Sequence, residues 1–133
     1  MEVDGGGGQV VGVGVDVVDL DRFGAVLARR PLMAERLFTP GERAVAQARR
    51  YPVPALAVRF AAKEAVMKAL GVGLGAFSFA EVEVVLGAEG APHLRVSGRA
   101  EALAASRSVG GWHLSLSHSG LVGIAVAVAV GPP

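Results

Sequence analysis

ALAVRFAAKEAVMKAL, residues 55–70, is the segment that decides the fold. Pro54 suits the first turn of a helix and Gly71 suits a left-handed C-cap, so the helix has a start and an end. With a rotation of about 100° per residue, the large apolar side chains fall on one narrow stripe. These side chains are Leu56, Phe60, Met67 and Leu70. The pattern predicts a long helix at the centre of the protein.

Charged residues lie in and beside this apolar stripe. Lys63 falls inside it, and Arg59 and Glu64 border it on opposite sides. Lys68 follows Glu64 by four residues. An unpaired buried ion costs several kcal/mol, so these charges need partners. Either Glu64 and Lys68 form an ordinary surface pair while Lys63 extends to water, or the charges bind a ligand. On this segment alone the surface pair is the simpler explanation.

A strand is predicted near the N-terminus, in QVVGVGVDVVD at residues 9–19. Alternation places Gly12, Gly14 and Asp16 on one face of the strand. The two glycines leave room for another backbone or a ligand to approach that face closely. The opposite face carries a row of valines, which are Val11, Val13, Val15 and Val17.

Asp16 ends this apolar strand and has two possible roles. It caps the helix that follows, or it joins Glu64 as a pair of hard oxygen ligands of the kind that Mg²⁺ prefers. In the second case phosphate oxygens and water complete the coordination, and nearby cations neutralise a polyphosphate. Those cations are Lys63, Lys68 and Arg59.

The rest of the chain predicts helices first and mostly strands later. Asp19 or Asp21 caps the first of these helices, a capping box at Thr39 opens the third, and Ser97 caps the last. Helices are expected at residues 19–28, 33–38, 40–50 and 97–108, and strands at 81–86, 93–96, 112–118 and 121–130. This order indicates an α+β fold, with an antiparallel sheet packed against the long central helix and shorter helices. The strand at 121–130 is apolar on both faces, which favours an oligomer interface.

The composition excludes several classes of protein. With 52% hydrophobic and 19% charged residues in 133, the chain has the composition of a folded domain. It has no cysteine, which removes disulfides, thiol nucleophiles and thiolate metal sites. A net charge of +1 argues against a nucleic-acid partner, and no apolar run is long enough to cross a membrane. We expect a cytoplasmic protein with a flexible glycine-rich leader at residues 1–8 and one domain at 9–133.

His118 ends a predicted strand between Ser117 and Ser119. A serine hydrolase would pair one of these serines with the histidine, but neighbouring strand residues point to opposite faces and no nucleophile-elbow motif is present. His118 serves as a phosphate ligand or a proton acceptor only if the hairpin tip meets the region of Asp16 and Glu64.

Three segments resemble the holo-[acyl-carrier-protein] synthases, the short single-domain 4′-phosphopantetheinyl transferases. They are GVGVDVVDLDRF at 12–23, RFAAKEAVMKALG at 59–71 and HLSLSHSG at 113–120, in that order. The resemblance spans residues 10–130 and implies that the 4′-phosphopantetheine arm of coenzyme A moves onto a serine of apo-acyl carrier protein. Adenosine 3′,5′-bisphosphate is the other product. It also implies a homotrimer with active sites between subunits.

The resemblance implies roles for individual residues. Asp16 and Glu64 match the Mg²⁺ ligands, and Lys68 matches a lysine that contacts phosphate, with Arg59 and Lys63 beside it. His118 matches a histidine of the same pocket. The general base stays open among metal-bound water, His118 and a carboxylate.

Arg22 matches an arginine on the helix that meets the acidic carrier protein. Arg29 extends a basic surface along the same helix, although arginines on a helix are more often simply solvated. The alternative to an enzyme is a non-catalytic module of this fold that binds a nucleotide or a carrier protein.

Overall fold

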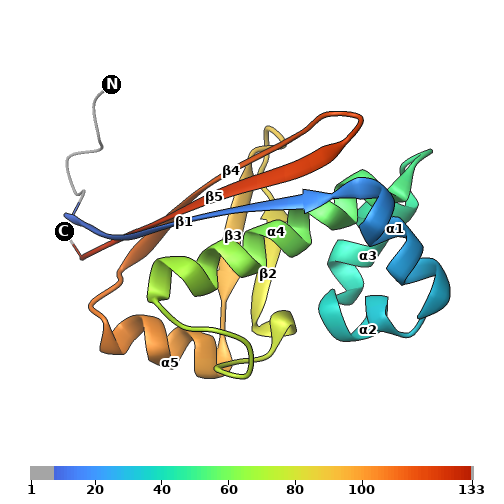
Figure 1. Ribbon diagram of the computed structural model, residues 1–133. Coiled ribbons are helices and arrows are strands. Elements are labelled where there is room, and N and C mark those ends of the chain that lie inside the picture. The colour runs from blue at the N-terminus through green and yellow to red at the C-terminus, as the bar shows by residue number, and fades with distance from the viewer. Residues whose placement is uncertain (1–7, 133) are drawn as a thin grey trace.

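The computed structural model describes residues 8–132, and its elements form a sheet laid across a long helix (Figure 1). The strands are β1 (Val10–Asp19), β2 (Val82–Leu86), β3 (Pro92–Val96), β4 (Gly111–His118) and β5 (Val122–Val130). The helices are α1 (Leu20–Arg29), α2 (Met33–Leu37), α3 (Pro40–Gln47), α4 (Pro52–Leu70) and α5 (Gly98–Ser106), with a short 3₁₀ turn, η1, at Phe79–Glu81. Residues 1–7 of the predicted leader lie outside the described residues, and the division of the chain at residue 8 stays a prediction.

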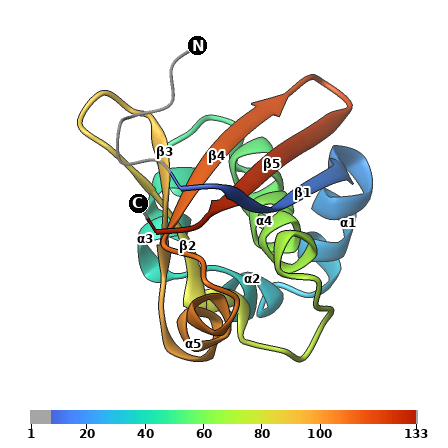
Figure 2. The same cartoon turned by 90° about the vertical axis from the view of Figure 1, so that its left-hand side faces the viewer.

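All strand pairs in residues 8–132 are antiparallel, so the predicted α+β class is confirmed. One sheet has the strand order β1-β5-β4, and β2 pairs with β3 in a separate hairpin. In Figure 1 this hairpin runs crosswise to the larger sheet, and Figure 2 shows α1–α3 and α5 arranged around the same central helix. Within the described residues no helix is long and apolar enough to cross a membrane.

Helix α4 packs against both β1 and β5, and its buried side is rich in alanine. Ala61, Ala62 and Ala65 are fully buried. Gly12 and Gly14 of β1 face this helix, and a β-carbon at either position would overlap a helix carbonyl oxygen. The strand therefore rests directly on the helix backbone, which is the close approach predicted for this face of β1.

The local start and stop signals explain most of the element boundaries. Asp19 accepts the Arg22 N–H at 2.8 Å and caps α1. Thr39 opens α3 with the predicted capping box. Gly71 closes α4 in the left-handed region, with φ of 71°, where glycine carries no steric penalty.

Predictions at three helix ends were wrong. Helix α3 ends at Gln47 rather than at Arg50. Helix α4 begins at Pro52 rather than Pro54, because two prolines fit in a first turn whose N–H groups have no helical partner. Ser97 makes no side-chain capping bond within the described chain. A carboxylate oxygen of Glu81 instead accepts the Arg99 N–H of α5 at 2.9 Å.

A buried ion pair joins α4 to α3. The Lys63 ammonium is fully buried and donates to Glu42 Oε1 at 2.8 Å, and to the carbonyl oxygens of Phe79 at 3.0 Å and Val82 at 2.5 Å. Glu42 also accepts backbone N–H groups from Thr39 and from β2. Burial lowers the pKa of Lys63, while the Glu42 carboxylate opposes that shift. The alternative in which Lys63 extends its ammonium to water is therefore wrong.

We predict that Lys63→Met lowers the free energy of unfolding by about 3–5 kcal/mol, because it leaves the buried Glu42 carboxylate without a counter-ion. Urea denaturation measures the loss. Adding Glu42→Gln to this variant restores part of it, since the amide removes the charge and keeps an acceptor for a backbone N–H.

Glu35→Ala is the matched control for this prediction. Glu35 pairs with Arg43 at 4.0 Å on the surface, where its side chain is 60% exposed. Loss of such a pair changes stability by less than about 1 kcal/mol. If Lys63→Met costs no more than Glu35→Ala, the buried pair does not stabilise the fold as argued.

Candidate active site

Asp16 and Glu64 line one cavity of about 660 Å³. Asp16 lies near the end of β1 and Glu64 in the middle of α4, and the contact of β1 with α4 brings the two elements together. The inner wall of the cavity is apolar. Phe60 of α4 stacks between Phe23 and Phe79, with ring centroids 5.2 and 5.6 Å apart. Carboxylates and aromatic rings therefore line the same cavity, which we call the carboxylate cavity.

The charged groups in and beside the carboxylate cavity influence one another. Burial raises the pKa of Glu64, the Asp16 carboxylate raises it further, and the Lys68 ammonium opposes both effects. Lys68 donates to Asp16 Oδ1 at 3.0 Å and to the Val15 carbonyl oxygen at 2.9 Å. Lys68 thus ties α4 to β1. The simple surface pair of Lys68 with Glu64 is not what the structure shows, because the ammonium reaches across to the strand.

These donors fit a magnesium ion. Two carboxylates supply hard oxygen ligands, and no cluster of three or more histidine, cysteine, aspartate or glutamate side chains suited to a metal occurs within residues 8–132. Zinc sites of proteins usually need three or four such ligands. Mg²⁺ is commonly held by one or two carboxylates, with water and substrate phosphate completing the octahedron. Asp16 and Glu64 would hold the ion here.

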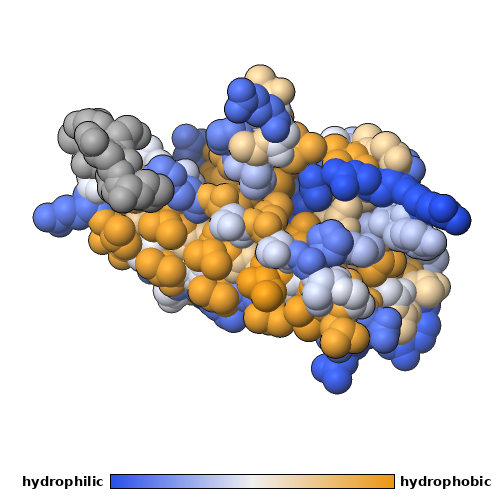
Figure 3. Space-filling model, turned by 90° about the horizontal axis from the view of Figure 1, so that it is seen from above, coloured by the Kyte–Doolittle hydropathy of each residue, from blue (hydrophilic) through white to orange (hydrophobic). Residues whose placement is uncertain are grey.

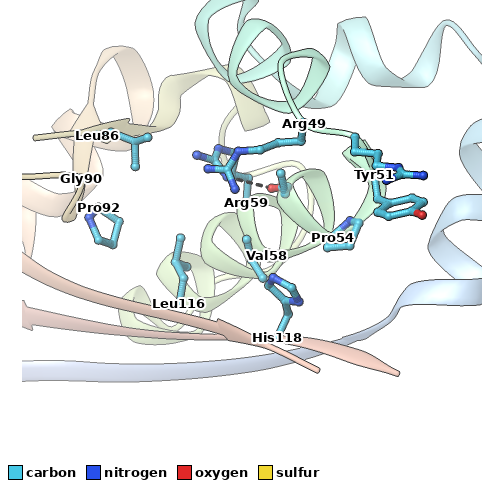
Figure 4. A pocket seen from close by; sticks show the side chains of 12 residues that line it. Arg49, Tyr51, Pro54, Val58, Arg59, Leu86, Gly90, Pro92, Leu116 and His118 are labelled. Carbon is cyan, nitrogen blue, oxygen red and sulfur yellow. Dashed lines mark hydrogen bonds between the residues drawn. The ribbon is translucent and has the colours of Figure 1, made fainter. Parts of the chain in front are cut away.

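A second cavity, of about 480 Å³, is lined by several arginines, and we call it the cationic cavity (Figure 4). Arg49 and Arg50 line it from the turn before α4, Arg59 from α4 itself, and His118 from the end of β4. Apolar side chains form the rest of the wall, among them Val58, Leu86, Pro92 and Leu116. A cavity with one cationic and one apolar side suits a ligand that has both a phosphate and a flat base.

Arg59 is the most unusual group in this second cavity. The residue is 4% exposed, and its guanidinium makes one hydrogen bond, from Nη1 to the Ala55 carbonyl oxygen at 3.0 Å. Its Nε has no partner among the described residues. Burial lowers the pKa of Arg59, the Glu42 carboxylate opposes that shift, and the nearby Arg49 adds to it. Unused buried donors of this kind favour an anion.

His118 does not share a cavity with Asp16 and Glu64 in one chain. The strand order explains the separation, because β4 and β1 lie on opposite edges of β5. Asp16 is paired with Ala125 and His118 with Gly123, so two strand spacings, roughly 10 Å, separate the two edges. The hairpin tip therefore does not meet the carboxylates within one chain.

The hydrogen bonds at this tip also contradict a serine hydrolase. The Ser119 hydroxyl oxygen accepts the N–H groups of Leu121 and Val122, at 3.1 and 3.2 Å, and so caps the turn. His118 Nδ1 lies 3.3 Å from the Ser119 carbonyl oxygen rather than from a hydroxyl. No serine nucleophile is paired with the histidine in the part of the chain that the structure describes.

The remaining predicted site residues lie either on the exposed side of α1 or in the core. Arg22 and Arg29 are exposed on α1, and Arg22 also lines the carboxylate cavity. The structure contradicts a phosphate role for Lys63, because all three of its N–H groups already have acceptors in the core.

Arg49 and Arg50 were missed by the sequence analysis, which treated them as the end of a helix. Helix α3 ends at Gln47 and α4 begins at Pro52, so the two arginines lie in the short turn between them. Two adjacent arginines directly before a proline-initiated helix were the available signal, because the positive end of a helix dipole adds to their charge.

Comparison with known proteins gives a consistent family. The family model of the 4′-phosphopantetheinyl transferase superfamily matches residues 12–126. A holo-[acyl-carrier-protein] synthase of Frankia casuarinae is 54% identical over 120 residues, which cover 90% of this chain and 97% of the relative. A Streptomyces coelicolor protein of the same name is 46% identical over 123 residues, 92% of this chain and 99% of that one.

Solved structures agree with the sequence comparison. The holo-[acyl-carrier-protein] synthase of Neisseria meningitidis superimposes with a TM-score of 0.83 at 32% identity, covering 91% of this chain and 98% of that one. The Bacillus anthracis enzyme, solved in complex with coenzyme A (3′,5′-ADP), has a TM-score of 0.77 at 34% identity, covering 92% and 98%. This chain belongs to the 4′-phosphopantetheinyl transferase superfamily.

The raised pKa of Glu64 predicts a pH dependence of stability. Above the ordinary value of 4.5 the unfolded chain releases this proton while the folded protein still holds it. The contribution of Glu64 to the free energy of unfolding therefore falls as the pH rises through that window. Glu64→Gln removes the effect, so the stability of the variant relative to the wild type should increase from about pH 4 to about pH 7.

Urea denaturation in metal-free buffer across this range checks the expectation. Glu101→Gln, at an exposed position of α5, is the control and should follow the wild-type profile. Parallel profiles for Glu64→Gln and the wild type would show that the proton on Glu64 is not linked to folding.

Proposed function

We propose that this protein transfers the 4′-phosphopantetheine group of coenzyme A to a serine of apo-acyl carrier protein. The products are holo-acyl carrier protein and adenosine 3′,5′-bisphosphate. The observation that carries the proposal is that Asp16 and Glu64, from distant parts of the sequence, line one cavity in a member of this family. The names of its relatives and the coenzyme A complexes of similar structures support the substrate.

The chemistry divides among the residues of the carboxylate cavity. The serine oxygen forms a bond to the phosphorus that bears the pantetheine arm, and the bond from that phosphorus to the leaving bisphosphate breaks. Asp16 and Glu64 would hold Mg²⁺, which when bound would neutralise the diphosphate and favour departure of the bisphosphate. The Lys68 side chain is 55% exposed beside Asp16 and adds a positive charge toward the same phosphates. The acceptor of the serine proton stays open among a carboxylate, water and His118, the last only where assembly brings the cavity that contains His118 beside this one.

The cationic cavity is the proposed site of the nucleotide part of coenzyme A. Arg59 presents a buried guanidinium with an unused donor, and Arg49, Arg50 and His118 surround it with further donors. The apolar wall formed by Leu86 and its neighbours suits the adenine ring. This assignment keeps Arg59 and His118 as coenzyme A ligands, as predicted, and leaves Lys63 out.

A homotrimer with shared active sites is part of the proposal. The outer face of β1 exposes Val13, Val15 and Val17, whose exposed fractions are 55%, 47% and 57%. Figure 3 looks onto this side of the molecule and shows apolar residues gathered over it. An apolar face of this kind favours burial against other copies. Assembly would also let the carboxylate cavity of one subunit meet the cationic cavity of the next.

The carrier protein is proposed to meet α1. Arg22 and Arg29 present positive charge along this helix, and Arg22 also lines the carboxylate cavity. A partner with an acidic surface would be attracted there, and its serine would approach Asp16 and Glu64. A cytoplasmic location, and the lack of a nucleic-acid or membrane partner, stay predictions from the sequence.

We predict that Glu64→Ala lowers the rate of transfer by at least about 100-fold, because one of the two metal ligands is lost. Mass spectrometry of apo-acyl carrier protein after incubation with coenzyme A and Mg²⁺ measures the modified fraction. Glu101→Ala, at an exposed position of α5 that lines neither cavity, should keep wild-type activity. Near-normal transfer by Glu64→Ala would contradict the mechanism, and no transfer by the wild type would favour the non-catalytic binding module.

We also predict that Val15→Glu converts the assembly to monomers, since a charge on the apolar face opposes its burial. Sedimentation velocity gives the oligomeric state, and Val15→Thr, which keeps the shape of the side chain, is the control. A wild-type protein that sediments as a stable monomer would overturn the shared active site.

A further inference from the structure

The contact between β1 and α4 lies next to both proposed metal ligands. Gly14 and Asp16 are two residues apart on the same face of β1, a spacing of roughly 7 Å along the strand. Gly14 rests on the carbonyl group of Ala65, the residue that follows Glu64. The strand and the helix thus touch two residues from Asp16 along β1 and one residue from Glu64 along α4.

No side chain fits at Gly14. A β-carbon there would overlap the Ala65 carbonyl oxygen, and would lie 2.7 Å from the Ala65 carbonyl carbon and 2.8 Å from the Ala69 nitrogen. Ordinary contacts between carbon atoms are about 3.5–4.0 Å. All three obstacles are backbone atoms inside a continuous helix, so they cannot turn aside as a flexible side chain would. The strand would have to withdraw from the helix by at least about 1 Å.

We propose that Gly14 is a positioning residue, whose missing side chain sets the separation between the Asp16 and Glu64 carboxylates and so the affinity of the site for a divalent ion. This inference rests on the proposed metal site. Metal–ligand distances tolerate deviations of only about 0.2 Å, so a withdrawal of roughly 1 Å exceeds what the site can absorb.

The hydrogen bonds of Lys68 depend on the same separation between β1 and α4. Its ammonium bridges from α4 to Asp16 Oδ1 at 3.0 Å and to the Val15 carbonyl oxygen at 2.9 Å. Both bonds require β1 to lie close to the helix beside Gly14. The bridge and the glycine contact therefore hold Asp16 at one distance from α4.

Gly12 offers a matched control on the same strand. A β-carbon at Gly12 would overlap the carbonyl oxygen of Ala69, which is again helix backbone. Gly12 is four residues from Asp16, about 13 Å along the strand, whereas Gly14 is two. Alanine at either position disturbs the same packing, but only Gly14 is adjacent to the carboxylates.

The experiment compares Gly14→Ala and Gly12→Ala with the wild type. Binding of Mn²⁺, a hard ion of the same coordination preference, is measured by electron paramagnetic resonance in the presence of coenzyme A. Thermal unfolding gives the stability of each variant. We expect Gly14→Ala to weaken Mn²⁺ binding at least 10-fold, and Gly12→Ala to weaken it less than 3-fold at a similar loss of stability, on the argument that ligand geometry sets affinity.

Two results would overturn the inference while leaving the metal site in place. One is wild-type affinity for Mn²⁺ in folded Gly14→Ala, and the other is equal weakening in both glycine variants. Failure of the wild type to bind Mn²⁺ would remove the metal site itself and the inference with it.

Asp16→Glu provides a second test, and in the wild-type background it does not depend on the folding of Gly14→Ala. In the wild-type spacing the extra methylene overshoots the site, so Mn²⁺ affinity should fall. In Gly14→Ala the same change spans the widened gap, and the double variant should bind Mn²⁺ more tightly than Gly14→Ala. Unchanged affinity in Asp16→Glu alone would show that the separation is not fixed.

Discussion

The direct contact of the β1 backbone with the α4 backbone is the constraint on which the rest of the structure depends. Gly12 and Gly14 on the strand meet the helix at Ala65 and Ala69, with no side chain between them. This contact brings the edge strand of the sheet close enough for Asp16 to share a cavity with Glu64. A larger residue at Gly12 or Gly14 would force the strand away from the helix, because the atoms on both sides of the contact are main chain.

The two buried cations of α4 show how similar burial leads to different roles. Lys63 donates to three acceptors, one of which is its counter-ion Glu42, so it joins α3, α4 and β2 and has no donor left for a ligand. Arg59 is almost as buried but uses its guanidinium for one bond to its own helix. Since unsatisfied buried donors are costly, the environment of Arg59 favours binding of an anion, whereas the satisfied Lys63 only stabilises the fold.

The two cavities impose a requirement on any ligand that uses both. Carboxylates line one cavity and arginines line the other, and the sheet places Asp16 and His118 on opposite edges of β5. A diphosphate held by a divalent ion at the first cavity and a further phosphate at the second would need groups from both edges. The exposed valines of β1 lie on the outer face of the same sheet, so the proposed assembly and the proposed site depend on one element.

The sequence by itself determined most of the elements and the alternation of faces along β1. Alternation in β1, the capping box at Thr39 and the glycine at the end of α4 are local signals, and they need no distant partner to act. Only the tertiary structure decided which charges pair. Lys63 binds Glu42 from α3, Lys68 binds Asp16 from β1 rather than its helical neighbour, and His118 lies across the sheet from the carboxylates. Pairing depends on which surfaces meet when the elements pack, and helical or strand periodicity carries no information about that.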